Sequence, residues 1–68
     1  MQEFHLKSEY IELMSLMKLT AMVSTGGEAG MRILNGEVSV NGITEYRKRA
    51  KLRVGDEVRF LAYRVKMV

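Results

Sequence analysis

The sequence contains no cysteine, no proline and no tryptophan, and it has a single histidine. Without cysteine the chain forms neither disulfides nor thiolate metal sites. No cluster of cysteine and histidine accompanies His5, so a zinc site of the usual ligand types is excluded. A lone histidine near the N-terminus is also a poor candidate for a catalytic base. We therefore expect no enzymatic activity, no cofactor and no metal.

Long apolar runs are missing too. No run approaches the roughly 18 residues that a membrane span needs. The first ten residues carry charges where a signal peptide would need an apolar core. A cytoplasmic location is therefore the expectation. Hydrophobic residues make up 47% and charged residues 28% of the 68 residues, which indicates one folded domain, residues 1–68, and not a disordered chain.

Charge is distributed unevenly along the chain. Residues 1–45 hold three basic and six acidic residues, a net charge of −3, whereas residues 46–68 hold eight basic and two acidic residues, a net charge of +6. Five of these bases fall in the segment "YRKRAKLR" (46–53). Such asymmetry indicates a polyanionic partner. The alternative is that exposed strands use lysine and arginine for solubility and to protect a sheet edge.

Hydrophobic periodicity predicts an α+β fold with elements in the order β-α-α-β-β-β. Residues 3–6 are typical of a short edge strand. Ser8 is expected to cap a first helix over about residues 9–18, because apolar side chains recur there at helical spacing. These side chains predict a methionine-rich core face, made of Tyr10, Ile11, Leu13, Met14, Leu16, Met17 and Leu19.

A second, short helix is expected to begin at "TGGEA" (25–29). Thr25 and Glu28 have the spacing of a capping box, in which the Thr25 hydroxyl accepts from the Glu28 N–H and the Glu28 carboxylate accepts from the Thr25 N–H. Asn35 and Gly36 both tolerate positive φ and should end the helix. The apolar residues that this helix carries are Ala29, Met31, Ile33 and Leu34.

Strands should follow the second helix. Val38 and Val40 are predicted to face the core, and Asn41-Gly42 is a strong signal for a type I′ hairpin turn, which needs positive φ at both positions. Two more strands are expected within residues 52–68, where Gly55-Asp56 supplies a turn. In these strands apolar residues alternate with charged ones, so the two kinds should lie on opposite faces. The apolar residues are Val58, Phe60, Tyr63, Val65 and Met67.

If residues 47–54 form an extended strand, the side chains of the basic run have a regular arrangement. Side chains then alternate between faces, and cations on one face recur about every 6.6 Å. One face would hold Arg47, Arg49, Lys51 and Arg53, and the other Ala50, Leu52 and Val54 with Lys48. Because no acids separate these like charges, an anion lying along them is favoured. Arginine can fork onto phosphate or stack on a base. Neighbouring Tyr46 offers either a stacking surface or a packing contact within a hairpin.

Two glycines open the second helix. Gly26-Gly27 lacks the sequence context of a nucleotide-binding loop. The free N–H groups of a helix N-terminus nevertheless favour a phosphate. The alternative is that the two glycines only let the chain pack tightly before the helix.

The segment "TGGEAGMRILNGEVSVNG" (25–42) resembles the RNA-binding domain of the ribosomal-protein-S-four type, also called the alpha-L motif. The family pattern is approximately S-x-S-E-A-x-x-x-I-x-x-G-x-V-x-V-N-G. It is matched without a gap by Thr25, Glu28, Ala29, Ile33, Gly36, Val38, Val40, Asn41 and Gly42. Residues upstream and downstream extend the likeness to about 10–60, where the chain is similar to the small stand-alone bacterial branch (YbcJ/YaaA-like).

This resemblance implies two or three short helices packed on a small, mostly antiparallel sheet. It also implies binding to structured RNA, ribosomal or transfer RNA, by the start of the second helix and the adjoining hairpin. Many members carry arginine where this chain has Gly26 and Gly30, so the basic run is expected to compensate. The predicted RNA-binding residues are Lys18, Thr25, Gly26, Gly27, Arg32, Asn41, Arg47, Lys48, Arg49, Lys51 and Arg53.

The leading hypothesis is thus a non-catalytic, monomeric RNA-binding module. A small protein-interaction or ribosome-assembly adaptor, contacting ribosome-associated proteins through exposed methionines, is the alternative. Binding to an anionic membrane surface is disfavoured because the helices carry acids at Glu9, Glu12 and Glu28.

Overall fold

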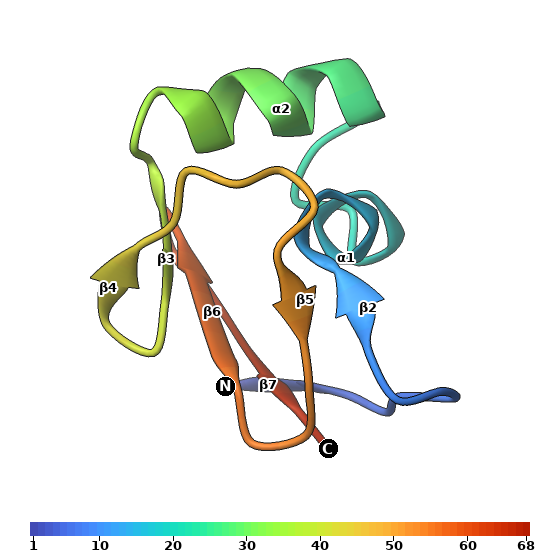
Figure 1. The fold of residues 1–68 in the computed structure, drawn as a ribbon. Coiled ribbons are helices and arrows are strands. Elements are labelled where there is room, and N and C mark those ends of the chain that lie inside the picture. The colour runs from blue at the N-terminus through green and yellow to red at the C-terminus, as the bar shows by residue number, and fades with distance from the viewer.

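The computed structural model describes residues 1–68 and has two helices and seven short strands (Figure 1). The main sheet has five strands in the order β1-β7-β6-β3-β4, and β2 and β5 form a separate antiparallel pair. Only β1 and β7 pair in parallel. The elements are β1 Gln2–Phe4, β2 Ile11–Glu12, α1 Leu13–Leu19, α2 Gly26–Leu34, β3 Val38–Val40, β4 Ile43–Thr44, β5 Lys51–Leu52, β6 Glu57–Phe60 and β7 Tyr63–Met67. This architecture confirms the α+β class, and β1 is the predicted edge strand.

One hydrophobic core joins the helices to the main sheet. Its 14 buried residues are all apolar, and no polar or charged side chain is buried. They are Leu13, Leu16, Met17, Met22, Val23, Ala29, Ile33, Val38, Ala50, Leu52, Val58, Phe60, Val65 and Met67. Two of them, Ala50 and Leu52, come from the basic segment, by which we mean residues 46–53. The core therefore holds this segment in place.

The hairpin turns follow from local sequence. Asn41 and Gly42 have φ angles of 53° and 83° between β3 and β4, as a type I′ turn requires. Gly55 has a φ of 98°, and the Asp56 N–H donates to the Arg53 carbonyl at 3.0 Å across the predicted turn. Tyr63, at the start of β7, is 39% exposed, whereas Val65 and Met67 on the same strand are buried.

The predicted start of the first helix is wrong. α1 begins at Leu13, and the Ser8 hydroxyl donates to the Tyr10 carbonyl instead of capping a helix. Ile11 and Glu12 form strand β2, which pairs with β5. The ladder continues into the helix, because the Leu13 N–H donates to the Ala50 carbonyl at 2.9 Å and the Met14 N–H donates to Lys48 at 3.1 Å. These distant carbonyls replace a side-chain cap, which α1 lacks.

α1 also has a narrower apolar face than predicted. Leu13, Leu16 and Met17 are fully buried, whereas Leu19 is 66% exposed and Tyr10 lies outside the helix. The three buried residues are spaced at i, i+3 and i+4, so they lie on one side of the helix, and only this side meets the core.

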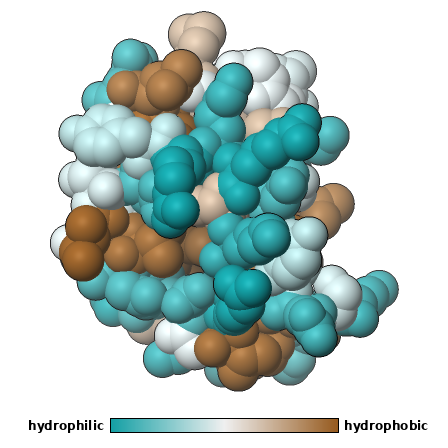
Figure 2. All heavy atoms as spheres, viewed as in Figure 1, coloured by the Kyte–Doolittle hydropathy of each residue, from teal (hydrophilic) through white to brown (hydrophobic).

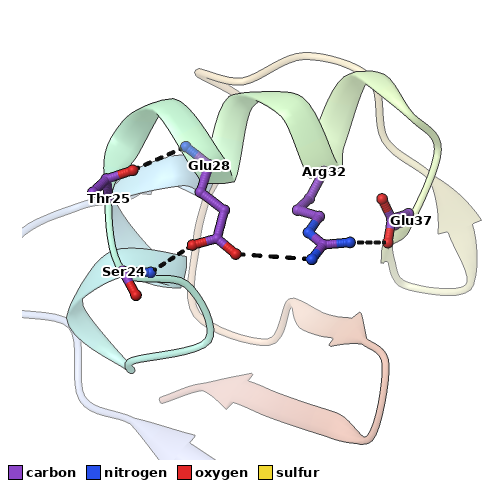
Figure 3. Close-up of polar contacts among 5 residues, drawn as sticks. All are labelled: Ser24, Thr25, Glu28, Arg32 and Glu37. Atoms are coloured by element: carbon purple, nitrogen blue, oxygen red, sulfur yellow. Dashed lines mark hydrogen bonds and ion pairs between the residues drawn. The ribbon is translucent and has the colours of Figure 1, made fainter.

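α2 begins and ends as its local sequence predicts, with two differences. Thr25 is the N-cap, and its hydroxyl accepts from the Glu28 N–H at 3.1 Å. The Glu28 carboxylate accepts from the Ser24 N–H at 2.9 Å and not from that of Thr25, so only half of the capping box forms as predicted (Figure 3). At the other end, Gly36 has a φ of 76° whereas Asn35, at −78°, does not take positive φ.

Candidate nucleic-acid interface

The β2–β5 ladder sets the orientation of the basic segment. Ile11 pairs with Leu52, and Glu12 pairs with Lys51. Leu52 is 1% exposed, so one face of this ladder packs on the core, and Lys51 therefore projects from the opposite face. The position of at least one cation thus follows directly from the burial of its neighbour.

Four of the five cations line one open hollow of about 410 Å³ together with Ala50; they are Arg47, Arg49, Lys51 and Arg53. These are the four that alternation predicts on a common face. The backbone that brings them together is different from the prediction, however. Figure 2 shows strongly hydrophilic side chains gathered on this side of the molecule, in the region that the β4–β5 connection crosses in Figure 1.

The predicted continuous strand over 47–54 is wrong. Only Lys51–Leu52 is a strand, and a turn precedes it in which the Ala50 N–H donates to the Arg47 carbonyl at 3.1 Å. Val54 is 70% exposed and does not face the core, because the chain turns again after β5. The predicted burial of Ala50 and Leu52 is confirmed. The carbonyls of Lys48 and Ala50 accept hydrogen bonds from the N–H groups of Met14 and Leu13 at the start of α1, which fixes the turn before β5 in place.

Most of these cations have no acidic partner. Arg47 is the exception, since its guanidinium donates to both carboxylate oxygens of Glu45 at 3.0 and 3.1 Å. These hydrogen bonds hold the pKa of the Glu45 carboxyl below its usual value. No ion pair is formed by Lys48, Arg49, Lys51 or Arg53. The hollow therefore carries three uncompensated positive charges and a fourth that is shared with a carboxylate.

Lys48 lies apart from the other four, as alternation predicts. It does not line the hollow, and its aliphatic stem passes over α2 at Gly30. A Cβ built on Gly30 would stand 2.9 Å from the Lys48 Cδ. Gly30 is thus buried beneath a lysine stem, which is consistent with the tendency of long cationic side chains to cover apolar surface.

The glycines at the start of α2 are not required by packing. Nothing lies within 4 Å of a Cβ built on Gly26, and Gly27 has only the Thr25 hydroxyl at 3.9 Å. The tight-packing alternative for these glycines is therefore wrong. Their N–H groups are at the N-terminus of a helix, where an anion is favoured electrostatically.

Arg32 is compensated within the protein. Its guanidinium lies 3.0 Å from a Glu37 oxygen and 3.8 Å from a Glu28 oxygen, so that two carboxylates flank it (Figure 3). Its Cζ also lies 5.9 Å from the centre of the Phe60 ring. Of the predicted RNA-binding residues, Arg32 is the one whose charge is most fully used in the fold.

Asn41 also has an internal role. Its amide nitrogen donates to Asp56 at 2.9 Å, and its amide oxygen accepts from the Glu57 N–H at 2.9 Å. Asp56 in turn accepts from the Arg53 N–H at 2.8 Å. This chain of contacts ties the β3–β4 hairpin to the turn that follows the basic segment. Lys18 is exposed in the last turn of α1, where a cation suits the helix dipole.

A comparison with known families accounts for this arrangement. A family model described as the S4 domain matches residues 4–68. The chain belongs to the S4 domain family. The family resemblance carried by residues 25–42 is thereby confirmed.

Relatives of this S4 domain are similar over almost their whole length. YbcJ of Escherichia coli (strain K12) and YbcJ of Shigella flexneri are each 37% identical over 62 residues, which is 91% of this chain and 89% of each relative. The solution structure of YbcJ from E. coli matches with a TM-score of 0.76 and 38% identity, covering 100% of this chain and 87% of that one. It is described as revealing an αL motif involved in RNA binding.

In this S4 domain the two positions where many members carry arginine have different surroundings. Gly30 is covered by the Lys48 stem, whereas Gly26 is open.

No three side chains of histidine, aspartate or glutamate converge where they could hold a metal ion. No helix is long and apolar enough to cross a membrane.

Sequence reasoning missed one residue of this surface. Tyr10 was placed in the apolar stripe of the first helix, but it lies in the loop before β2, with the Lys51 Nζ 5.0 Å and the Arg53 Cζ 5.8 Å from the centre of its ring. No local signal reveals this proximity, because it depends on the pairing of β2 with β5, about 40 residues apart in sequence.

Proposed function

We propose that this protein is a non-catalytic RNA-binding protein whose target is structured RNA of the ribosomal or transfer type. The single observation that carries this proposal is the hollow in which three uncompensated cations and Arg47 converge on a segment anchored in the core. The description of YbcJ, a relative in the same family, supports RNA as the polyanion.

The contact roles divide by how each side chain is used in the fold. Arg49, Lys51 and Arg53 contact backbone phosphates, because their charges are free and their backbone is held by Ala50 and Leu52. Arg47 joins them when a phosphate competes for its guanidinium. The N–H groups of Gly26 and Gly27 donate to a further phosphate at the helix start.

The remaining predicted residues support RNA binding indirectly. Thr25, Arg32 and Asn41 hold the helix and the hairpin in position through the hydrogen bonds and ion pairs described above. Lys18 and Lys48 contribute to the positive field without lining the hollow. The proposal is for a monomeric, cytoplasmic protein.

The test is RNA affinity over a series of salt concentrations. A protein that replaces counterions at three or four phosphates should lose affinity with a logarithmic slope of roughly −2 to −4 against salt. Fluorescence anisotropy with a labelled RNA hairpin and with a transfer RNA measures this slope. No measurable binding at low salt, or binding that is insensitive to salt, would rule out the proposal.

A second candidate is a small protein-interaction or ribosome-assembly adaptor. Met31 and Leu34, one helical turn apart on α2, are 64% and 60% exposed, and this observation favours it. Cross-linking in cells would separate the two candidates. Recovery of RNA supports the leading proposal, whereas recovery of ribosome-associated protein without RNA supports the adaptor.

A further inference from the structure

Tyr10 lies on the solvent face of the β2–β5 ladder. The ladder pairs Ile11 with Leu52, so continuing the register by one residue sets Tyr10 opposite Arg53. Residues opposite each other on paired strands project from the same face. The ring distances agree, since Arg53 and Lys51 lie 5.8 and 5.0 Å from the ring centre. Tyr10 is therefore held at the border of the hollow that these two cations line.

The Tyr10 ring is not needed to complete the core. It is 38% exposed, whereas its neighbour Ile11 is partly buried and packs against the core. The other two tyrosines have packing partners of another kind. Tyr46 lies against Gly36, and Tyr63 stacks on Phe60 at 6.3 Å between ring centres. Of the three tyrosine rings, only that of Tyr10 has cations over it.

We propose that Tyr10, Arg53 and Lys51 form a binding site for one unpaired nucleotide of a structured RNA. The base stacks on the Tyr10 ring and on the planar guanidinium of Arg53, and its phosphate lies in the hollow beside Arg49 and Lys51. This inference rests on the proposed function and narrows its ligand from structured RNA in general to RNA with a bulged or looped-out residue.

The chemistry of RNA favours this assignment. The faces of bases inside an A-form helix are stacked on one another and closed to side chains, whereas unpaired bases stack on aromatic rings and on arginine. Stacking on an aromatic side chain tolerates any base, because every base has a π face. A ring placed beside cations that form no ion pair can therefore meet a base and its phosphate together.

The experiment compares two RNA hairpins that differ by a single bulged 2-aminopurine nucleotide. The wild-type protein should bind the bulged hairpin about tenfold more tightly than the fully paired one. It should also quench the fluorescence of the bulged base, because stacking on a ring quenches 2-aminopurine. Tyr10→Phe should keep both properties, since the ring and not the hydroxyl makes the contact.

Tyr10→Leu should bring the affinity for the bulged hairpin down to that for the paired one and abolish the quenching. Tyr63→Leu is the matched control, because Tyr63 is 39% exposed and has no cation over its ring. It should preserve the preference for the bulge. Thermal unfolding of each variant checks that the fold is retained, and Tyr10→Phe keeps the test open if Tyr10→Leu unfolds.

The outcomes distinguish this inference from the function on which it rests. Equal binding of both hairpins by the wild type, or equal losses for both in Tyr10→Leu, would overturn the nucleotide site and leave RNA binding intact. A loss of the bulge preference in Tyr10→Phe would overturn stacking as the cause. Failure of the wild type to bind either hairpin at low salt would instead overturn the proposed function.

Discussion

Two parts of this S4 domain carry residues predicted to meet RNA, and they use their charge differently. In α2, Arg32 lies between two carboxylates and beside an aromatic ring, so its positive charge is paired within the protein. In the basic segment, no carboxylate pairs with Lys48, Arg49, Lys51 or Arg53. The first region stabilises the domain, and the second presents charge to solvent.

Under the proposed function, the position of a cation in a family pattern does not by itself predict a contact with RNA, because its charge can be paired within the protein. The basic segment keeps like charges close together, which is unfavourable for an isolated fold. It can do so because apolar Ala50 and Leu52 are buried, and because two of its carbonyls accept hydrogen bonds from the start of α1. Apolar packing and backbone hydrogen bonds thus hold the segment in place, so its charged side chains remain free to bind an anion.

The largest expected effect comes from removing the free charges. The triple variant Arg49→Gln, Lys51→Gln and Arg53→Gln should lose about 100-fold in RNA affinity, because three lost contacts of about 0.9 kcal/mol each, the net size of an ordinary hydrogen bond, sum to about 2.7 kcal/mol. Its salt slope should fall by about 2 to 3. Anisotropy titrations over a salt series measure both quantities.

The matched control for that variant removes three cations from β6 and β7, through Arg59→Gln, Arg64→Gln and Lys66→Gln. It changes the net charge equally and should weaken binding only a few-fold, by long-range attraction alone. Equal losses in the two triple variants would show that net charge matters and the location of the cations does not.

The second effect concerns the Asn41 turn, which ties the β3–β4 hairpin to the turn that follows the basic segment. Asn41→Ala removes the contacts with Asp56 and Glu57 and forces alanine into positive φ, so it should cost roughly 2 kcal/mol of stability. The melting temperature should fall by about 10 °C in a domain of this size. Asn41→Gly keeps the turn geometry and should lose only about half as much. A change in RNA affinity without a change in melting temperature would instead make Asn41 a direct contact.

A smaller effect is expected where the two kinds of charge meet. Glu45→Gln breaks the forked contact with Arg47 and should raise RNA affinity about two- to fivefold, because a phosphate no longer competes with a carboxylate. Titration of the wild type and the variant with the same RNA hairpin tests this. A lower affinity in the variant would mean that Glu45 orients Arg47 for binding.

The pH dependence of stability gives an independent check on the Glu45–Arg47 contact. The pKa of Glu45 in the folded protein lies below its ordinary value near 4.5. A carboxyl whose pKa is lowered by folding stabilises the protein above its unfolded pKa, and this stabilisation is lost as the pH falls through the folded value. Melting temperatures should therefore show a difference between wild type and Glu45→Gln that shrinks below about pH 4.5.

The smallest effect on RNA is expected at Arg32. Arg32→Gln should leave RNA affinity within about twofold, and it should lower stability by less than about 1 kcal/mol because the pair is partly exposed to solvent. Binding and thermal unfolding of the same preparation separate the two effects. A loss as large as that of the triple variant would erase the contrast between the two regions.

Local chemistry made much of this fold predictable. The Thr25 cap, the end of α2 at Gly36 and the Asn41-Gly42 hairpin each depend on one or two neighbouring residues, and all three form. The start of α1 depends instead on carbonyls about 35 residues away in the sequence, which accept hydrogen bonds from its first N–H groups. For this reason Ser8 and the helical spacing that follows it predict the wrong start. Intrinsic preference for helix yields where a distant strand offers backbone partners.

For the candidate site, the sequence by itself determined which cations are present and that Ala50 and Leu52 between them face the core. Only the tertiary structure decided how those cations converge. The turn before β5 lets four cations line one hollow, the ladder between β2 and β5 brings Tyr10 to its border, and the Lys48 stem lies over Gly30. Side-chain alternation is a local property of the backbone, whereas compensation of a charge depends on which distant group the fold sets beside it.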